Sequence, residues 1–148
     1  MSNLSALQVA VDAATRQRDD ARRLLQQMQR ARDAAQGQLV QIESYAREIE
    51  ARWGMQEGAV MLPERLFHLY QFLGRLEHAA GLQKTVLQDH DQRVASAAQA
   101  LLHAELRLTS LRKVLERRAQ ELALRQMRQD QKQTDERAAL KYRHTNNA

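Results

Sequence analysis

The sequence has no cysteine, one proline and only 4% aromatic residues among 148. Without cysteine, neither disulfide bonds nor thiolate metal sites can form. No window of eighteen consecutive apolar residues occurs, so we expect no segment to span a membrane. Residues 1–7 contain no basic segment followed by an apolar run, so we expect no secretory signal. These absences predict a protein of the cytoplasm.

Residues suited to catalysis or metal binding are also scarce. There is no glycine-rich phosphate loop and no nucleophile elbow. In the run Asp89-His90-Asp91, successive side chains would point to different sides of a helix, which does not suit a metal site. We also expect His90 to be exposed. The sequence therefore predicts no enzyme, metal or cofactor, and the histidines are widely spaced, at His68, His78, His90, His103 and His144.

The charge balance is basic, with a formal net charge of +5 and a pI near 10.1. A basic chain favours an acidic partner. However, arginine alternates with acidic residues along most of the chain, as in residues 116–121, and this pattern is typical of a solvated helical face. Nucleic-acid binding would need a basic stripe with stacking aromatics, which is absent. We expect no nucleic-acid partner.

What the sequence does contain is two arrays of heptad repeats. A strict seven-residue repeat keeps one stripe aligned only when two helices supercoil around each other. The sequence therefore predicts an all-α fold, a long antiparallel two-helix coiled-coil hairpin with an overhanging C-terminal helix. The first array is Leu4, Leu7, Val11, Ala14, Arg18, Ala21, Leu25, Met28, Arg32, Ala35, Leu39, Ile42, Ala46, Ile49 and Trp53, and the second is Leu66, Leu69, Leu73, Leu76, Ala80, Gln83, Leu87, His90, Val94, Ala97, Leu101, Ala104, Leu108, Leu111 and Leu115.

The helix breakers cluster between the two arrays. Pro63 suits the first turn of a helix, where its missing N–H costs nothing, and Gly54 and Gly58 can end a helix and reverse the chain. We predict one domain over residues 1–148. Its parts are a helix over about 4–53, a tip loop over about 54–63, a helix over about 64–141 and a short polar tail.

An eight-residue connection predicts a register. It places Leu7 opposite Leu108 and Arg32 opposite Gln83, and it leaves the chain after about residue 111 without a partner. A register displaced by one heptad is an alternative. A polar layer of Arg32 and Gln83 would weaken the seam but disfavour slipped registers. The other possibility is that Arg32 extends out of the narrow seam.

Two surfaces could bind partners. At the tip, Tyr45 and Phe72 flank the same side of the seam and should form an aromatic ridge, while Gly74 and Gly81 lie at outward positions where a partner backbone could approach. Alternatively, the aromatics only broaden the seam and the glycines are tolerated. The second surface is the overhang, which is charged on every face over residues 128–136. Such a helix either bridges to a partner or is only partly formed alone.

Three stretches of the chain resemble the FliJ family, the small coiled-coil component of the bacterial flagellar type III export apparatus. The resemblance extends over essentially the whole chain, and its residues off the seam are the more specific part. The stretches are Gln38-Leu39 to Tyr45 with Glu48 following, Tyr70-Gln71-Phe72-Leu73-Gly74-Arg75-Leu76-Glu77, and Asp130-Gln131-Lys132 with Asp135-Glu136.

The resemblance implies three partners. They are the hexameric ring of a FliI-like export ATPase, whose assembly the protein would promote as a central stalk, the cytoplasmic domain of a FlhA-like export gate protein, and export chaperones. It also implies a peripheral position at the cytoplasmic face of the membrane. The implied gate-binding patch is Gln38, Ile42, Tyr45, Ile49, Phe72, Leu76, Ala79 and Gln83, and the implied ring contact is Arg118, Arg125, Arg128, Asp130, Gln131 and Lys132.

Ile49 and Gln83 depart from the family's usual residues, an aromatic and a histidine, which makes them the weaker members of that patch. Two alternative functions stay open. One is the equivalent stalk protein of a virulence secretion system, which would have nearly the same heptads. The other is a holdase chaperone that grips exported subunits with its tip.

Overall fold

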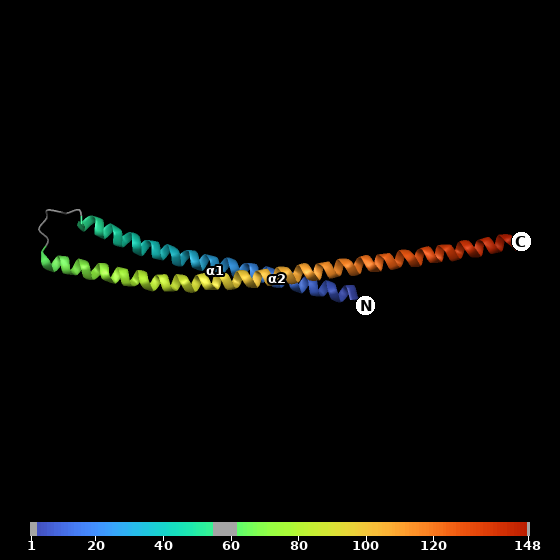
Figure 1. Ribbon diagram of the computed structural model, residues 1–148, viewed down its shortest axis with the longest axis horizontal. Helices are drawn as coiled ribbons and strands as arrows, with labels where there is room; N and C mark the ends of the chain where they lie inside the picture. Colours follow the sequence, from blue (N-terminus) through green and yellow to red (C-terminus); the bar gives the residue numbers. More distant parts are fainter. Residues whose placement is uncertain (1–2, 55–61, 148) are drawn as a thin grey trace. The chain divides into compact units, whose positions relative to one another are not determined.

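The computed structural model describes residues 3–54 and 62–147, which form two helices packed against each other (Figure 1). Helix α1 spans Asn3–Gly54 and helix α2 spans Pro63–Asn146. No strand occurs in the described residues, so the predicted all-α helical hairpin is confirmed. Both helix starts lie within one residue of the prediction, and α2 continues five residues beyond its predicted end at 141.

Local chemistry accounts for where α2 begins. Pro63 is its first residue, and the carbonyl of Leu62 accepts a hydrogen bond from the N–H of Leu66 at 3.2 Å. Proline at the first helical position loses no hydrogen bond, since that N–H would have no partner within the helix. Glu64 in the first turn and Arg143 in the last turn have the charges that the helix dipole favours.

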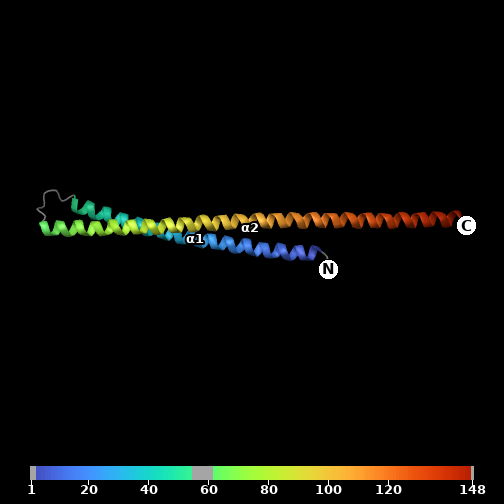
Figure 2. The same cartoon turned by 60° about the horizontal axis from the view of Figure 1, so that its bottom comes forward.

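The chain divides into two compact units. One combines residues 1–18 with 103–148, and the other is residues 19–102. In the 19–102 unit, the α1 and α2 segments run antiparallel and lie side by side in both views (Figures 1 and 2). In the other unit, the first turns of α1 lie against α2, and α2 continues beyond the start of α1.

The predicted seam is confirmed by the burial of side chains. Every buried residue of the described chain occupies a heptad position, and four of the seven are alanines, which allow two helices to approach closely. Only the tip ends of the arrays depart from the prediction, because Trp53 and Leu66 are exposed. The buried residues are Val11, Ala14, Ala35, Ile49, Ala80, Ala97 and Leu108.

In the unit that contains both termini, the packing of the core differs from the predicted register. Leu108, which is 2% exposed, packs with Val11 and Ala14, not with the predicted Leu7. Leu115 also packs against this cluster. The contacts are displaced by about one helical turn along α1, because a heptad pattern alone does not distinguish between neighbouring registers.

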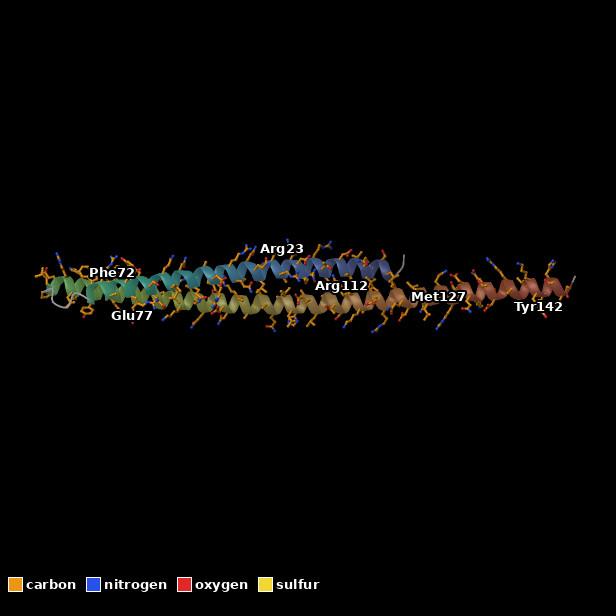
Figure 3. The ribbon with its side chains drawn as sticks, turned by 90° about the horizontal axis from the view of Figure 1, so that it is seen from above. Arg23, Phe72, Glu77, Arg112, Met127 and Tyr142 are labelled. Carbon is orange, nitrogen blue, oxygen red and sulfur yellow. The ribbon has the colours of Figure 1, made fainter. Side chains whose placement is uncertain are left out.

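The same displacement moves the start of the overhang. Asn3 and Leu4 of α1 line a hollow of about 250 Å³ together with residues of α2 as far as Arg125. The prediction that α2 has no partner after about residue 111 is therefore wrong. Among the described residues, the stretch of α2 without a partner in α1 begins beyond Arg125, and Figure 3 shows Met127 and Tyr142 on this part of α2.

In the 19–102 unit, the polar seam residues pair differently from the prediction. Gln83 donates from Nε2 to the backbone carbonyl of Ala35 at 2.8 Å and to Oε1 of Gln38 at 3.0 Å. Arg32 donates from Nε to Oδ1 of Asp91 at 2.8 Å. The predicted layer of Arg32 against Gln83 is wrong, and each residue makes its own bonds across the seam.

Arg32 follows the alternative that its side chain leaves the seam. The side chain is 35% exposed, and a second guanidinium nitrogen bonds to Oε1 of Gln36 at 2.7 Å. The hydrogen bond to Asp91 raises the pKa of Arg32 above its ordinary value. The predicted exposure of His90 is wrong, because the side chain is half-buried and its Nδ1 is enclosed without a hydrogen-bond partner among the described residues.

Candidate docking surfaces

The predicted aromatic ridge is present in the 19–102 unit. The rings of Tyr45 and Phe72 meet edge to face, with centroids 6.0 Å apart and planes at 89°. Such pairs prefer this geometry because the ring edge is positive and the ring face negative. Tyr45 is 49% exposed and Phe72 39% exposed, so the ridge bridges the two helices and still presents apolar surface to solvent.

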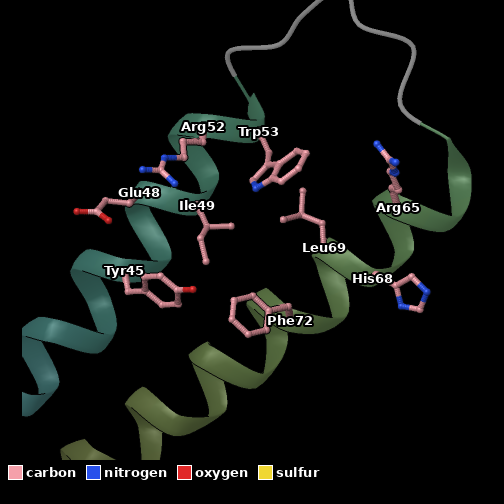
Figure 4. Close-up of a pocket in the computed structure, with 9 residues that line it drawn as sticks. All are labelled: Tyr45, Glu48, Ile49, Arg52, Trp53, Arg65, His68, Leu69 and Phe72. Atoms are coloured by element: carbon pink, nitrogen blue, oxygen red, sulfur yellow. The ribbon is translucent and has the colours of Figure 1, made fainter.

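A cleft of about 440 Å³ lies beside this ridge, between the end of α1 and the start of α2 (Figure 4). We call it the tip cleft. Ile49 and Trp53 of α1 and Leu69 of α2 point into the gap, while the charged side chains stand at its outer edges. The lining residues are Tyr45, Glu48, Ile49, Arg52, Trp53, Arg65, His68, Leu69 and Phe72.

The rim of the tip cleft is basic. Arg52 comes from the last turn of α1 and Arg65 from the first turn of α2, and Glu48 is the single acidic residue of the lining. Neither arginine forms an ion pair within residues 3–54 and 62–147. An apolar floor with a cationic rim can hold an apolar group next to a negative charge.

Sequence reasoning missed most of this cleft. The heptads predict that Trp53 lies in the seam, yet it is 42% exposed. The available signal was the tryptophan itself, the only one in the chain, next to the helix breakers and between Arg52 and Arg65. Trp53 lies in the last turn of α1, where a side chain has fewer neighbours from its own helix than in the middle.

The structure gathers the gate-binding patch implied by the resemblance into the 19–102 unit, but its members differ in exposure. Gln38 and Gln83 bond to each other, and Ile49 is buried at 9% exposed. Tyr45 and Phe72 present the largest apolar surface. The remaining patch members, which are half-buried, are Ile42, Leu76 and Ala79.

The two glycines line a different hollow from the tip cleft. Gly74 and Gly81 border a groove of about 830 Å³ together with Ile42, Leu73 and Tyr70. An added Cβ at either glycine would meet no atom within 4 Å. Packing within the described chain therefore does not require glycine at these positions.

The ring-contact residues implied by the resemblance lie on α2 and are all exposed. Arg118 and Arg125 line the hollow with Leu4, so they adjoin α1. The others lie on the part of α2 beyond Arg125, where Asp130 accepts a hydrogen bond from Gln126 at 3.3 Å. These others are Arg128, Asp130, Gln131 and Lys132.

The described residues hold no group of three or more histidine, cysteine or acidic side chains that could bind a metal ion. Asp89 pairs with Arg93 at 3.1 Å and Asp91 with Arg32, so the acids beside His90 are engaged by arginines. Neither helix, in its described part, is long and apolar enough to cross a bilayer.

Comparisons with known proteins agree on one family. The family model of the flagellar FliJ protein matches residues 3–147. The chain is 29% identical to the flagellar FliJ protein of Salmonella typhi over 144 residues, which cover 95% of this chain and 98% of the relative. The flagellar FliJ protein of Escherichia coli (strain K12) matches with the same identity and coverage.

Proposed function

Because the chain belongs to the flagellar FliJ family and is a component of flagellar protein export, we propose that it acts as a stalk in the ring of the export ATPase. It promotes assembly of that ring, links the ring to the cytoplasmic domain of the export gate protein and handles export chaperones. It does this without catalysis of its own, in the cytoplasm at the membrane-bound base of the flagellum.

The observation that carries the stalk proposal is the state of α2 beyond Arg125. This segment continues as helix to Asn146, yet all its described side chains are exposed. Residues 128–136, which are charged on every face and pack against no other described part of the chain, are suited to bridging to a partner. A surface of mixed sign, such as Arg128, Asp130 and Lys132, can make polar contacts with subunits in different states.

Symmetry supplies the mechanism. One helix inside a six-fold ring cannot contact all six subunits alike, so it binds the subunits' conformations unequally. A ligand shifts an equilibrium only by its difference in affinity for the two states. Contacts of unequal strength therefore hold the subunits in different states, and the helix also lowers the free energy of the assembled ring relative to free subunits.

The link to the export gate is supported by the Tyr45–Phe72 ridge. Aromatic residues that are partly exposed on a polar surface are frequent anchors of protein interfaces. The edge-to-face pair holds both rings in place before binding, so little side-chain entropy is lost when a partner covers them. We assign no surface to the export chaperones.

The test combines this protein with the cognate export ATPase and measures ATP hydrolysis and ring formation together. The full chain is compared with a chain that ends after Arg125, because that truncation removes only exposed helix. A Tyr45→Ala variant is the matched control at the other surface. The proposal predicts stimulation by the full chain and by Tyr45→Ala, and its loss on truncation. If the full chain changes neither ATP hydrolysis nor ring formation, the stalk role is refuted.

A second candidate is a holdase chaperone that grips exported subunits with its tip. The tip cleft favours it, since Trp53, Leu69 and Phe72 offer apolar surface near the chain reversal. Suppression of aggregation of an unfolded export substrate, in the absence of the ATPase and abolished by Trp53→Ala, would support this function. The family match is to flagellar proteins, which favours a flagellar role over the virulence-system alternative.

A further inference from the structure

We propose that the tip cleft receives a bulky apolar side chain from an acidic segment of a protein partner. Arg52 and Arg65 bind the flanking carboxylates, and Trp53 and Leu69 enclose the apolar group. The inference rests on the proposed gate link, because the cleft adjoins the Tyr45–Phe72 ridge and the same partner would cover both.

The apolar floor of the cleft favours binding of an apolar group. Ile49, Leu69 and Phe72 line it, and the side chain of Trp53 is 42% exposed. Aromatic residues make up only 4% of the chain. The cleft's volume of about 440 Å³ falls within the range of sites that enclose most of a small ligand. Water in such a cleft has few hydrogen-bond partners on the apolar floor, so an apolar side chain displaces it favourably.

The arginines at the rim of the cleft favour a negatively charged partner. Some cations of the 19–102 unit pair with acids, as Arg32 does with Asp91 and Arg93 with Asp89. Arg52 and Arg65 have no ion-pair partner among the described residues, and both line the cleft, one from each helix. Guanidinium groups bind carboxylates through two parallel hydrogen bonds.

Charge also selects between possible occupants. A second copy of this chain docked tip to tip would bring four arginines together, and like charges in an interface oppose association. A basic or neutral segment would leave both arginines without a counter-charge next to a partly desolvated cleft. An acidic segment with one large apolar residue meets both requirements.

The test uses the purified cytoplasmic domain of the export gate protein as the probe. Its affinity for the wild-type chain is measured by calorimetry and compared with that for Arg52→Glu/Arg65→Glu. A matched control, Arg30→Glu/Arg75→Glu, makes the same change of charge at exposed arginines of the same unit that do not line the cleft. Circular dichroism confirms that each variant stays helical.

Trp53 provides a second readout. It is the only tryptophan, so 5-fluorotryptophan incorporated into this chain alone gives one fluorine resonance that reports the cleft. We expect this resonance to shift when the gate domain binds. We expect reversal of Arg52 and Arg65 to weaken binding at least about tenfold and the control less than about threefold. Raising salt from about 0.05 to 0.3 M should weaken wild-type binding more than that of the reversed variant.

Each contrary result is distinguishable. Gate binding that is equally strong in the reversed variant and the control, or a Trp53 resonance that does not move, overturns the cleft proposal and leaves the gate link standing. A resonance that shifts with protein concentration alone, with a dimer in sedimentation, overturns the choice of partner. A gate domain that does not bind the wild-type chain overturns the gate link, and the cleft proposal with it.

Discussion

Gln83 of α2 donates its side-chain amide to the backbone carbonyl of Ala35 in α1, at 2.8 Å, from a heptad position in the middle of the seam. The same nitrogen lies 3.0 Å from Oε1 of Gln38. Because heptads repeat every seven residues, apolar packing alone is similar in registers that differ by a heptad. A displaced register would place Gln83 opposite other side chains, so its bond to Gln38 favours the observed register.

The register can be tested by disulfide formation, which is clean in a chain without native cysteine. We expect Val11→Cys with Leu108→Cys to form a disulfide rapidly, because these side chains share a core cluster, and Leu7→Cys with Leu108→Cys to form it more slowly. In a chain that also carries Gln83→Leu, we expect both cysteine pairs to form a disulfide. Faster closure of the Leu7 pair in the wild-type background would contradict the register described here.

The core cluster predicts a contrast between two leucines. Leu108 is 2% exposed and Leu106 is 56% exposed. Leu108→Ala leaves a cavity and should lower the free energy of unfolding by about 2–5 kcal/mol. Leu106→Ala should change it by less than about 1 kcal/mol, since little buried surface is lost. Urea unfolding followed by circular dichroism measures both, and equal losses would show that Leu108 is not the centre of packing.

The two glycines of the 19–102 unit should be replaceable with a gain in stability. An added Cβ at Gly74 or Gly81 meets no atom within 4 Å, and glycine inside a helix costs about 0.5–1 kcal/mol relative to alanine. We therefore expect Gly74→Ala/Gly81→Ala to raise the free energy of unfolding by about 1–2 kcal/mol. A loss of stability in urea unfolding would mean that the glycines serve the packing of the hairpin.

The contact between Arg32 and Asp91 has a defined pH dependence. The hydrogen bond to Asp91 raises the pKa of Arg32. A raised pKa in the folded state means that this contribution to stability is fully present below the unfolded pKa of arginine and is lost only as pH rises through the folded pKa, in the strongly alkaline range. The difference in melting temperature between the wild type and Arg32→Gln should therefore stay constant from about pH 6 to pH 9, where arginine is protonated in both states.

High salt should shrink this difference, because the side chains of Arg32 and Asp91 are 35% and 51% exposed. A difference in melting temperature that changes steeply between about pH 6 and pH 9 would show that a group other than Arg32 is titrating.

The sequence alone predicted the seam, the helix limits near the tip and the meeting of Tyr45 with Phe72, because heptad positions determine which side chains face the partner helix. It did not predict the register, since that depends on single bonds such as Gln83 to Ala35. It also did not predict the tip cleft. Trp53 fits the heptads as well as Ile49 does, yet Trp53, in the last turn of α1, is exposed and Ile49 is buried.

The most direct test of the stalk proposal is a reversal of charge on the exposed part of α2. Arg128→Glu/Lys132→Glu changes two residues beyond the end of the seam, and Arg107→Glu/Lys113→Glu makes the same change on exposed positions where α2 still runs beside α1. Stimulation of the cognate export ATPase should fall at least about tenfold in the first variant, through lost polar contacts with the ring, and less than about twofold in the second. Full stimulation by Arg128→Glu/Lys132→Glu, with rings forming as for the wild type, would contradict the proposal.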